Sequence, residues 1–96
     1  MSTISKKELV DRIADKNKVK RITVKTVIHQ FLDEIIIELS KNNRIEFRDF
    51  GVFEVKQRAE RKAQNPKTLE PVFVPAKRTV KFKEGRLIKE KLNGQE

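Results

Sequence analysis

The first pattern along the chain is a short run of apolar residues at helical spacing, in which positions 9, 10, 13 and 14 share one face. Ser5 and Glu8 have the spacing of a capping box, and Ile4 and Leu9 have that of a hydrophobic staple. The sequence therefore predicts a short amphipathic helix over about residues 6–16.

A longer apolar stripe predicts a second helix over about residues 24–41, ended by "KNNR". Its residues recur in steps of three and one and are Val24, Val27, Ile28, Phe31, Leu32, Ile35, Ile36 and Leu39. Ile37 widens the stripe beyond one face. A helix that is apolar over so much of its circumference usually covers both its own domain and a second subunit.

From Arg44 onward the period changes to two, which is typical of β-strands. The segments on either side of "RDFG" predict a hairpin, and two longer segments that flank "NPKT" predict a ribbon with a turn near residues 65–69. Pro71 and Pro75 lack an N–H donor, so this is an edge ribbon. Leu87, Ile88 and Leu92 then indicate a short third helix, followed by "NGQE" as a frayed tail.

Composition and charge narrow the class of protein. A chain of 96 residues supports one domain with a modest core, which dimerisation could enlarge. The net charge of +9 favours a polyanionic partner, either nucleic acid or an acidic membrane surface. The sequence has no cysteine and no apolar run of signal-peptide or membrane-spanning length, so we expect a cytoplasmic protein without a membrane partner.

The sequence does not indicate an enzyme. His29, the single histidine, lies beside the apolar stripe, where a structural or exposed role is usual. Glu34 and Glu38 form an i, i+4 pair on a polar helical face, which is ordinary for a solvated helix. The three glycines form no phosphate-binding loop. We therefore expect no catalytic residue, no metal and no cofactor.

Basic residues concentrate in the predicted ribbon, where six cations lie within 21 positions: Arg58, Arg61, Lys62, Lys67, Lys77 and Arg78. On a two-stranded limb they could follow the phosphates of duplex DNA, although a solvated basic loop would show the same composition. At the tip, Pro66 is either a turn proline or an apolar wedge that unstacks a base step from the minor groove.

The segment "FRDFGVFEVKQRAERKAQNPKTLEPVFVPAKRTVKFKEGRLIKEKL" and the two-helix pattern before it resemble the bacterial HU and integration host factor family of DNA-bending proteins. The "FGVFEV" strand, "RAER", the "NPKT" tip and "FKEGRLIK" carry the resemblance. It implies an α+β fold: an intertwined dimer with a helical body, a small antiparallel sheet and two β-ribbon arms on double-stranded DNA. Residues 1–96 would form one domain, with a helical dimerisation part over about 1–43 and the remainder over about 44–96.

The resemblance also implies functional residues. Pro66 matches the family's intercalating proline. The expected DNA-binding residues are Lys6, Arg48, Arg58, Arg61, Lys62, Gln64, Asn65, Pro66, Lys67, Lys77, Arg78, Arg86 and Lys89. The expected dimer core is Phe31, Leu32, Ile35, Phe47, Phe50, Phe53 and Phe82, whereas Phe73 lies on the arm. The partner subunit would be a second copy or a paralogue, and the location the bacterial nucleoid.

Four positions leave alternatives open. Arg48 either reaches the minor groove or is a solvent-facing charge. Ala63, Gln64 and Leu69 stand where the family has a glycine, an arginine and a glycine. Without the glycines the tip uses another turn or carries strain, and the neutral Gln64 weakens the groove contact unless Lys62 or Lys67 compensates.

Two other functions compete with DNA bending. An RNA-binding or ribosome-associated protein would carry a similar charge, but the sequence lacks Trp, Tyr and an aromatic pattern for base stacking. A structural oligomer could instead use basic arms to hold acidic proteins. Competition by duplex DNA would distinguish this last possibility.

Overall fold

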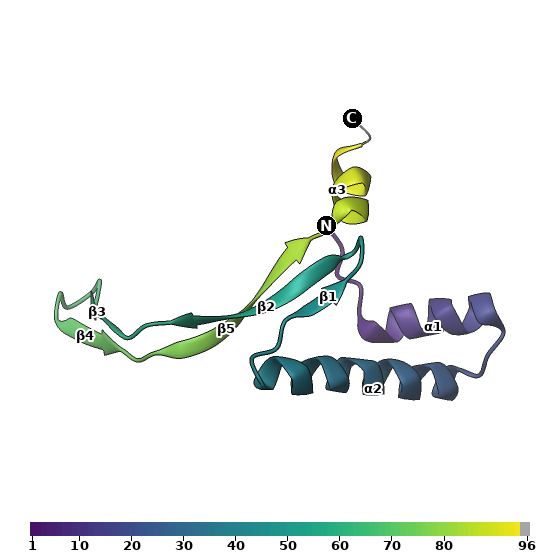
Figure 1. The fold of residues 1–96 in the computed structure, drawn as a ribbon, viewed down its shortest axis with the longest axis horizontal. Helices are drawn as coiled ribbons and strands as arrows, with labels where there is room; N and C mark the ends of the chain where they lie inside the picture. The colour runs from purple at the N-terminus through teal and green to yellow at the C-terminus, as the bar shows by residue number, and fades with distance from the viewer. Residues whose placement is uncertain (95–96) are drawn as a thin grey trace. The chain divides into compact units, whose positions relative to one another are not determined.

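Figure 1 shows the computed structural model of the protein, which describes residues 1–94. The elements in chain order are α1 (Lys6–Asn17), α2 (Arg21–Ser40), β1 (Ile45–Phe47), β2 (Gly51–Arg58), β3 (Arg61–Gln64), β4 (Pro71–Val74), β5 (Lys77–Glu84) and α3 (Arg86–Asn93). Residues 1–37 form one unit, and the residues from Glu38 onward form a second. The predicted α+β fold class is confirmed.

The cap that starts α1 is the one its sequence predicts. The Ser5 Oγ accepts a hydrogen bond of 3.3 Å from the Glu8 N–H, which satisfies one of the first donors of the helix. The helix ends at Asn17, and Lys18 caps it with a left-handed backbone whose N–H bonds the carbonyls of Ala14 and Asp15. An ion pair between Asp11 and Arg21 then connects α1 to α2.

The second helix begins three residues before the predicted start, at Arg21 instead of Val24. The Lys20 carbonyl accepts hydrogen bonds from the N–H groups of Thr23 and Val24, so the first turn forms from residues that carry little of the apolar stripe. The helix ends at Ser40, and Asn42 follows with φ 66°, which confirms the predicted stop at "KNNR".

The buried apolar core in the described part of the chain is small. Val10, Ala14 and Val24 are exposed by 1%, 6% and 8%, and Ile28 packs against them. Several residues expected in a dimer core are exposed on the single chain: Phe31, Leu32, Phe50 and Phe82 by 52%, 39%, 50% and 40%. Such an apolar surface is typical of an interaction site.

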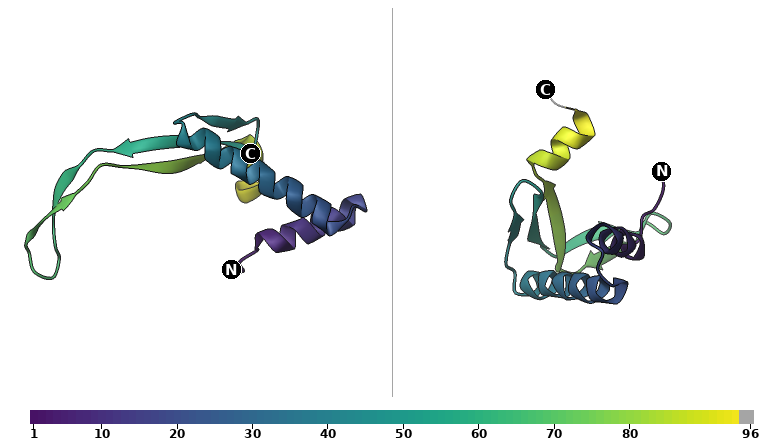
Figure 2. Two further views of the ribbon diagram at one scale, coloured as in Figure 1. Left: turned by 90° about the horizontal axis from the view of Figure 1, so that it is seen from below. Right: turned by 90° about the vertical axis from the view of Figure 1, so that its right-hand side faces the viewer.

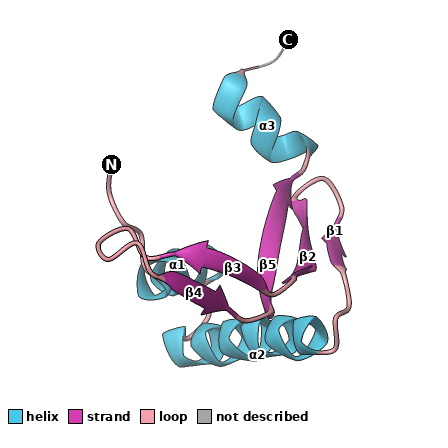
Figure 3. Ribbon diagram, turned by 90° about the vertical axis from the view of Figure 1, so that its left-hand side faces the viewer, coloured by secondary structure: helices cyan, strands magenta, loops and turns pink. Residues whose placement is uncertain are grey.

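Strands β1, β2 and β5 form an antiparallel sheet in that order (Figure 3). The predicted β1–β2 hairpin is confirmed, with Ile45 opposite Phe53 and a turn in which the Phe50 N–H bonds the Phe47 carbonyl at 3.0 Å. Phe53 lies opposite Phe82 on β5, and their ring centroids are 4.8 Å apart. These rings pack on one face of the sheet, as the alternation in sequence predicts.

The predicted ribbon is also confirmed. The pairing of β2 with β5 ends where Arg58 lies opposite Lys77. Beyond it, β3 and β4 pair as a separate two-stranded sheet that ends where Gln64 lies opposite Pro71 (Figure 2). Residues 59–60 and 75–76 interrupt the strands, and Pro75 lies in this interruption. Pro71, in the two-stranded arm, and Pro75, between two strands, therefore remove no hydrogen bond from the middle of a sheet.

Helix α3 starts where β5 ends. The Gly85 N–H bonds the Phe50 carbonyl at 2.7 Å, and the Leu87 N–H bonds the Asp49 carbonyl at 3.0 Å, so the β1–β2 turn holds the start of the helix. The predicted third helix is confirmed. Of the expected "NGQE" tail, Asn93 is the last helical residue, and positions 95–96 lie outside the described residues.

Candidate nucleic-acid interface

Five cations share one face of the β2–β5 ribbon, and we call this the cationic face. The pairing places Lys56 opposite Thr79 and Arg58 opposite Lys77, while Lys81 and Lys83 follow on β5 at alternate positions. Because side chains alternate across a strand, these residues lie on the same side, and the phenylalanines lie on the other. The cationic face comprises Lys56, Arg58, Lys77, Lys81 and Lys83.

Positive charges repel one another on this face. The pKa of Lys56 is lowered from its ordinary value, first by a side-chain hydrogen bond with Lys81 and then by the positive charges of Lys81 and Lys83. An ammonium group whose pKa is lowered in this way is stabilised in its charged form by an anion that comes close to it. A polyanion bound to the cationic face would therefore reduce this repulsion.

Glu54 is the one carboxylate within this face in the described structure. Its side chain is 22% exposed and lies 3.4 Å from the Lys83 Nζ and 3.8 Å from the Arg44 Nε. The carboxylate offsets part of the positive charge and holds Lys83 in place. A phosphate that binds Lys83 must compete with this ion pair.

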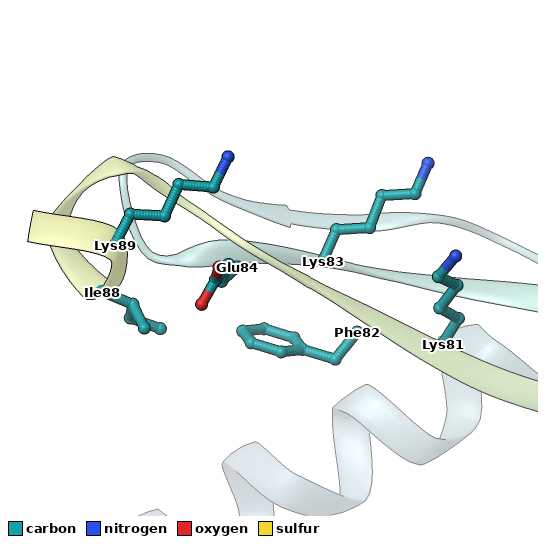
Figure 4. Close-up of a pocket in the computed structure, with 6 residues that line it drawn as sticks. All are labelled: Lys81, Phe82, Lys83, Glu84, Ile88 and Lys89. Carbon is teal, nitrogen blue, oxygen red and sulfur yellow. The ribbon is translucent and has the colours of Figure 1, made fainter. Parts of the chain in front are cut away.

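The lysines at the end of β5 converge with one from α3. In Figure 4 the side chains of Lys81, Lys83 and Lys89 extend to the same side, whereas the ring of Phe82 lies on the other side. These residues line a shallow open depression together with Glu84 and Ile88. Three ammonium groups at this spacing can follow successive phosphates of a nucleic-acid backbone.

Sequence reasoning selected Lys89 but missed Lys56, Lys81 and Lys83. The signal was present in "VKFKE", where lysine alternates with an apolar phenylalanine at strand period. Lys56 needed more, because only the pairing of β2 with β5 brings it beside Lys81.

Along the arm, the predicted cations Arg61, Lys62 and Lys67 are exposed. Arg61 lies opposite Val74, and Lys62 lies opposite Phe73, so the two cations take opposite faces of the β3–β4 ribbon. Phe73 is 60% exposed. The arm therefore carries charge and apolar surface on both of its faces.

The tip is a turn held by hydrogen bonds on both sides of Pro66. The Leu69 N–H bonds the Asn65 carbonyl at 2.8 Å, and the Asn65 N–H bonds the Glu70 carbonyl at 2.9 Å. The Asn65 Oδ1 accepts from the Lys67 N–H at 2.9 Å, and the Gln64 Nε2 donates to the Leu69 carbonyl at 2.9 Å. Pro66 is exposed within this closed turn.

The two missing glycines have different consequences. Ala63 lies in β3 and pairs with Val72, so a side chain is accommodated there without strain. Leu69 has φ 60°, in the left-handed region, where a residue with a Cβ pays about 1–2 kcal/mol. Of the two expected outcomes, another turn or strain, the tip shows strain at Leu69. Gln64, expected to weaken the groove contact, braces this strained residue.

The remaining predicted residues are dispersed. The Arg78 guanidinium points to the end of α2, where it donates to the Ser40 carbonyl at 3.0 Å and the Asn42 Oδ1 at 2.8 Å. Arg86 lies 3.1 Å from Glu90 and 3.6 Å from Asp49, and these carboxylates raise its pKa, Glu90 most strongly. Both cations are thus engaged within the chain.

Two further predicted DNA-binding residues, Lys6 and Arg48, lie outside the ribbon and α3. Lys6 is the first residue of α1, and its Nζ lies 3.5 Å from the Nδ1 of His29. Arg48 is exposed in the β1–β2 turn, beside Asp49, so the structure leaves both of its interpretations open. His29 itself is solvent-exposed and lies 3.5 Å from Asp33.

No group of three or more His, Cys, Asp or Glu side chains in residues 1–94 is placed to hold a metal ion. None of the helices that the structure describes is long and apolar enough to cross a membrane.

Comparison with known proteins places this arrangement in a family. The profile of the family described as "Bacterial DNA-binding protein" matches residues 4–93. The probable DNA-binding protein HU of Chlamydia pneumoniae is 42% identical over 90 residues, which cover 93% of this chain and 90% of that protein. The integration host factor subunit alpha of Mannheimia succiniciproducens is 37% identical over 87 residues, covering 91% and 89%.

Solved structures agree. The protein in the Anabaena HU–DNA cocrystal structure matches with a TM-score of 0.86 and 35% identity, over 96% of this chain and all of that one. The chain therefore belongs to the bacterial DNA-binding protein family, the family of HU and integration host factor.

Proposed function

We propose that this protein binds double-stranded DNA as an architectural protein and has no catalytic activity. The observation that carries the proposal is the cationic face, which presents like charges along a ribbon and continues into an arm with further exposed cations. Phosphate neutralisation by such a surface releases counterions and drives binding without base readout. The HU of the Anabaena cocrystal, to which this fold is similar, is bound to DNA.

The finer proposal is that the arm enters the minor groove and bends the duplex. Pro66 is exposed at the tip of a hydrogen-bonded turn, so it is presented as a rigid apolar ring. Inserted between base pairs, such a ring unstacks one step at a cost of a few kcal/mol, which the contacts of the bent duplex offset. The predicted DNA-binding residues remain part of this proposal, with Lys56, Lys81 and Lys83 added.

We further propose that the protein acts as a dimer in the bacterial nucleoid, with residues 1–96 as a single DNA-binding domain. The support is twofold: one chain has a small buried core, and Phe31, Phe50 and Phe82 are exposed on it. A second copy, or a paralogous subunit, would remove this apolar surface from water.

Energy transfer between the ends of a duplex of about 35 base pairs tests the function. The protein should shorten the end-to-end distance in a salt-sensitive manner, and double-stranded RNA of the same sequence should show no shortening. Equal binding to RNA would instead favour the RNA-binding alternative.

The wedge is tested by Pro66→Ala, which should reduce bending more than affinity. Pro71→Ala is the matched control, because Pro71 lies on the same arm but in the ladder opposite Gln64. An unchanged bend angle with Pro66→Ala would exclude the wedge while leaving DNA binding in place.

A further inference from the structure

Leu69 presents apolar surface that its own chain leaves mostly uncovered. The residue lies at the tip of the arm and is 66% exposed. The backbone on either side is fixed, because its N–H bonds the Asn65 carbonyl and its carbonyl accepts from Gln64. Leu69 is therefore held in the left-handed region with φ 60° and its side chain in water.

Neither feature benefits the free protein. A glycine at position 69 would adopt the same backbone without strain and would expose no apolar side chain. A residue kept in a sparsely populated conformation, with its side chain directed at solvent, is typical of a ligand-binding position. A partner that covers Leu69 would therefore stabilise this conformation.

The chemistry around Leu69 indicates what this partner is. Lys67 lies two residues away, Arg61 and Lys62 lie on the same arm, and all three are exposed. A polyanion with apolar surface inside it matches such surroundings, and a nucleic-acid duplex has phosphates outside and base faces within. Leucine is among the residues that proteins insert between base steps from the minor groove.

Resting on the function proposed above, we propose that Leu69 is a second wedge residue, which contacts the same unstacked base step as Pro66. The hydrogen bond between the Leu69 N–H and the Asn65 carbonyl closes a five-residue turn that contains Pro66, so both residues belong to one tip. The wedge of this chain is then two residues wide. Pyrimidine–purine steps, which unstack most easily, become the preferred bend sites.

The test compares three variants that differ in apolar surface and in backbone strain. Leu69→Gly and Leu69→Asn both suit the left-handed region but lack the apolar side chain. Leu69→Met keeps an apolar side chain of similar volume. Readouts are end-to-end energy transfer and the fluorescence of 2-aminopurine at a central TA step, which rises when the base unstacks.

Leu69→Gly and Leu69→Asn should each weaken the Kd about tenfold and remove at least half of the bend and of the fluorescence rise. Leu69→Met should behave like the unmodified protein. The dependence of Kd on salt should stay the same in all three, because no charge changes. Amide exchange at Asn65 should be no faster in Leu69→Gly, which would show that the turn remains closed.

Bending by Leu69→Gly and Leu69→Asn that equals or exceeds that of the unmodified protein would overturn the second wedge while the proposed function stands. If the unmodified protein binds DNA but neither bends it nor raises the fluorescence, the wedge proposals for Pro66 and Leu69 both fail. Loss of bending in Leu69→Met as well would also contradict the proposal, because an apolar side chain would then not suffice.

Discussion

Lys81 offers the sharpest test of the cationic face. It lies opposite Glu54 on the ribbon and depresses the pKa of Lys56. Lys81→Gln removes the charge and keeps a polar side chain. If the cationic face binds phosphates, this substitution should weaken DNA binding and should also relieve repulsion within the free protein.

The magnitude follows from counterion release. Each phosphate contact contributes about 0.9 to the slope of log K against log salt. In the proposed dimer each chain loses one contact, so the slope should fall by about 1.8. Over a fourfold rise in salt, from about 50 to 200 mM, the unmodified dimer should lose about 12 times more affinity than the variant dimer.

The folding stability of Lys81→Gln should not fall, although its DNA binding weakens. The pKa of Lys56 is lowered in the folded chain, so at neutral pH, where Lys56 is charged in both states, the repulsion destabilises the fold. As pH rises through the lowered pKa, the unfolded chain holds more protons and stability increases. Lys81→Gln should therefore raise the pKa of Lys56, leave the Tm at neutral pH equal or higher, and reduce this rise with pH.

Fluorescence anisotropy of a labelled duplex at four salt concentrations measures the slope, and thermal unfolding measures the Tm. Lys81→Arg keeps the charge and is the matched control, with the slope expected to stay the same. An undiminished slope in Lys81→Gln would refute the phosphate contact. A lower slope accompanied by a clearly lower Tm would point to damage to the sheet instead.

Three further predictions concern the framework that carries the ribbon. Arg78→Met should destabilise the protein by about 1–2 kcal/mol, measured by urea unfolding, because two hydrogen bonds to the end of α2 are lost. Gly51→Ala should lower the Tm through a cost of about 1–3 kcal/mol, because an added Cβ would overlap the Phe82 ring. The pKa of Glu38 is lowered, chiefly by its hydrogen bond with Asn43, so stability should fall as pH drops through that lowered pKa, and Glu38→Gln should remove this part of the acid dependence of the Tm.

Each has its own control. Arg58→Met removes an arginine of the same ribbon from the cationic face and should leave stability unchanged, so equal losses would contradict the role of Arg78. Gly94→Ala tests glycine loss where no atom lies within 4 Å of an added Cβ, although its φ of 76° carries a local cost. For Glu38, identical acid dependence in the variant would refute the assignment.

Much of the fold could be predicted because its elements are specified locally. The cap at Ser5, the apolar stripe of α2 and the period of two after Arg44 each depend on residues close in sequence. The start of α2 was missed by three residues, since backbone hydrogen bonds to the Lys20 carbonyl extend the helix past its apolar stripe. The arm could be recognised from "NPKT" and the flanking prolines.

The sequence by itself determined the elements, the positive charge and the arm with Pro66 at its tip, because periodicity, capping and proline chemistry act over a few residues. The tertiary structure decided which cations act together. Pairing of β2 with β5 brings Lys56 beside Lys81, whereas it turns Arg78 toward the end of α2. The tertiary structure also showed that Ala63 is accommodated in a strand while Leu69 is strained. The φ of Leu69 could not be predicted, because the backbone of a turn residue depends on the hydrogen bonds that close the turn.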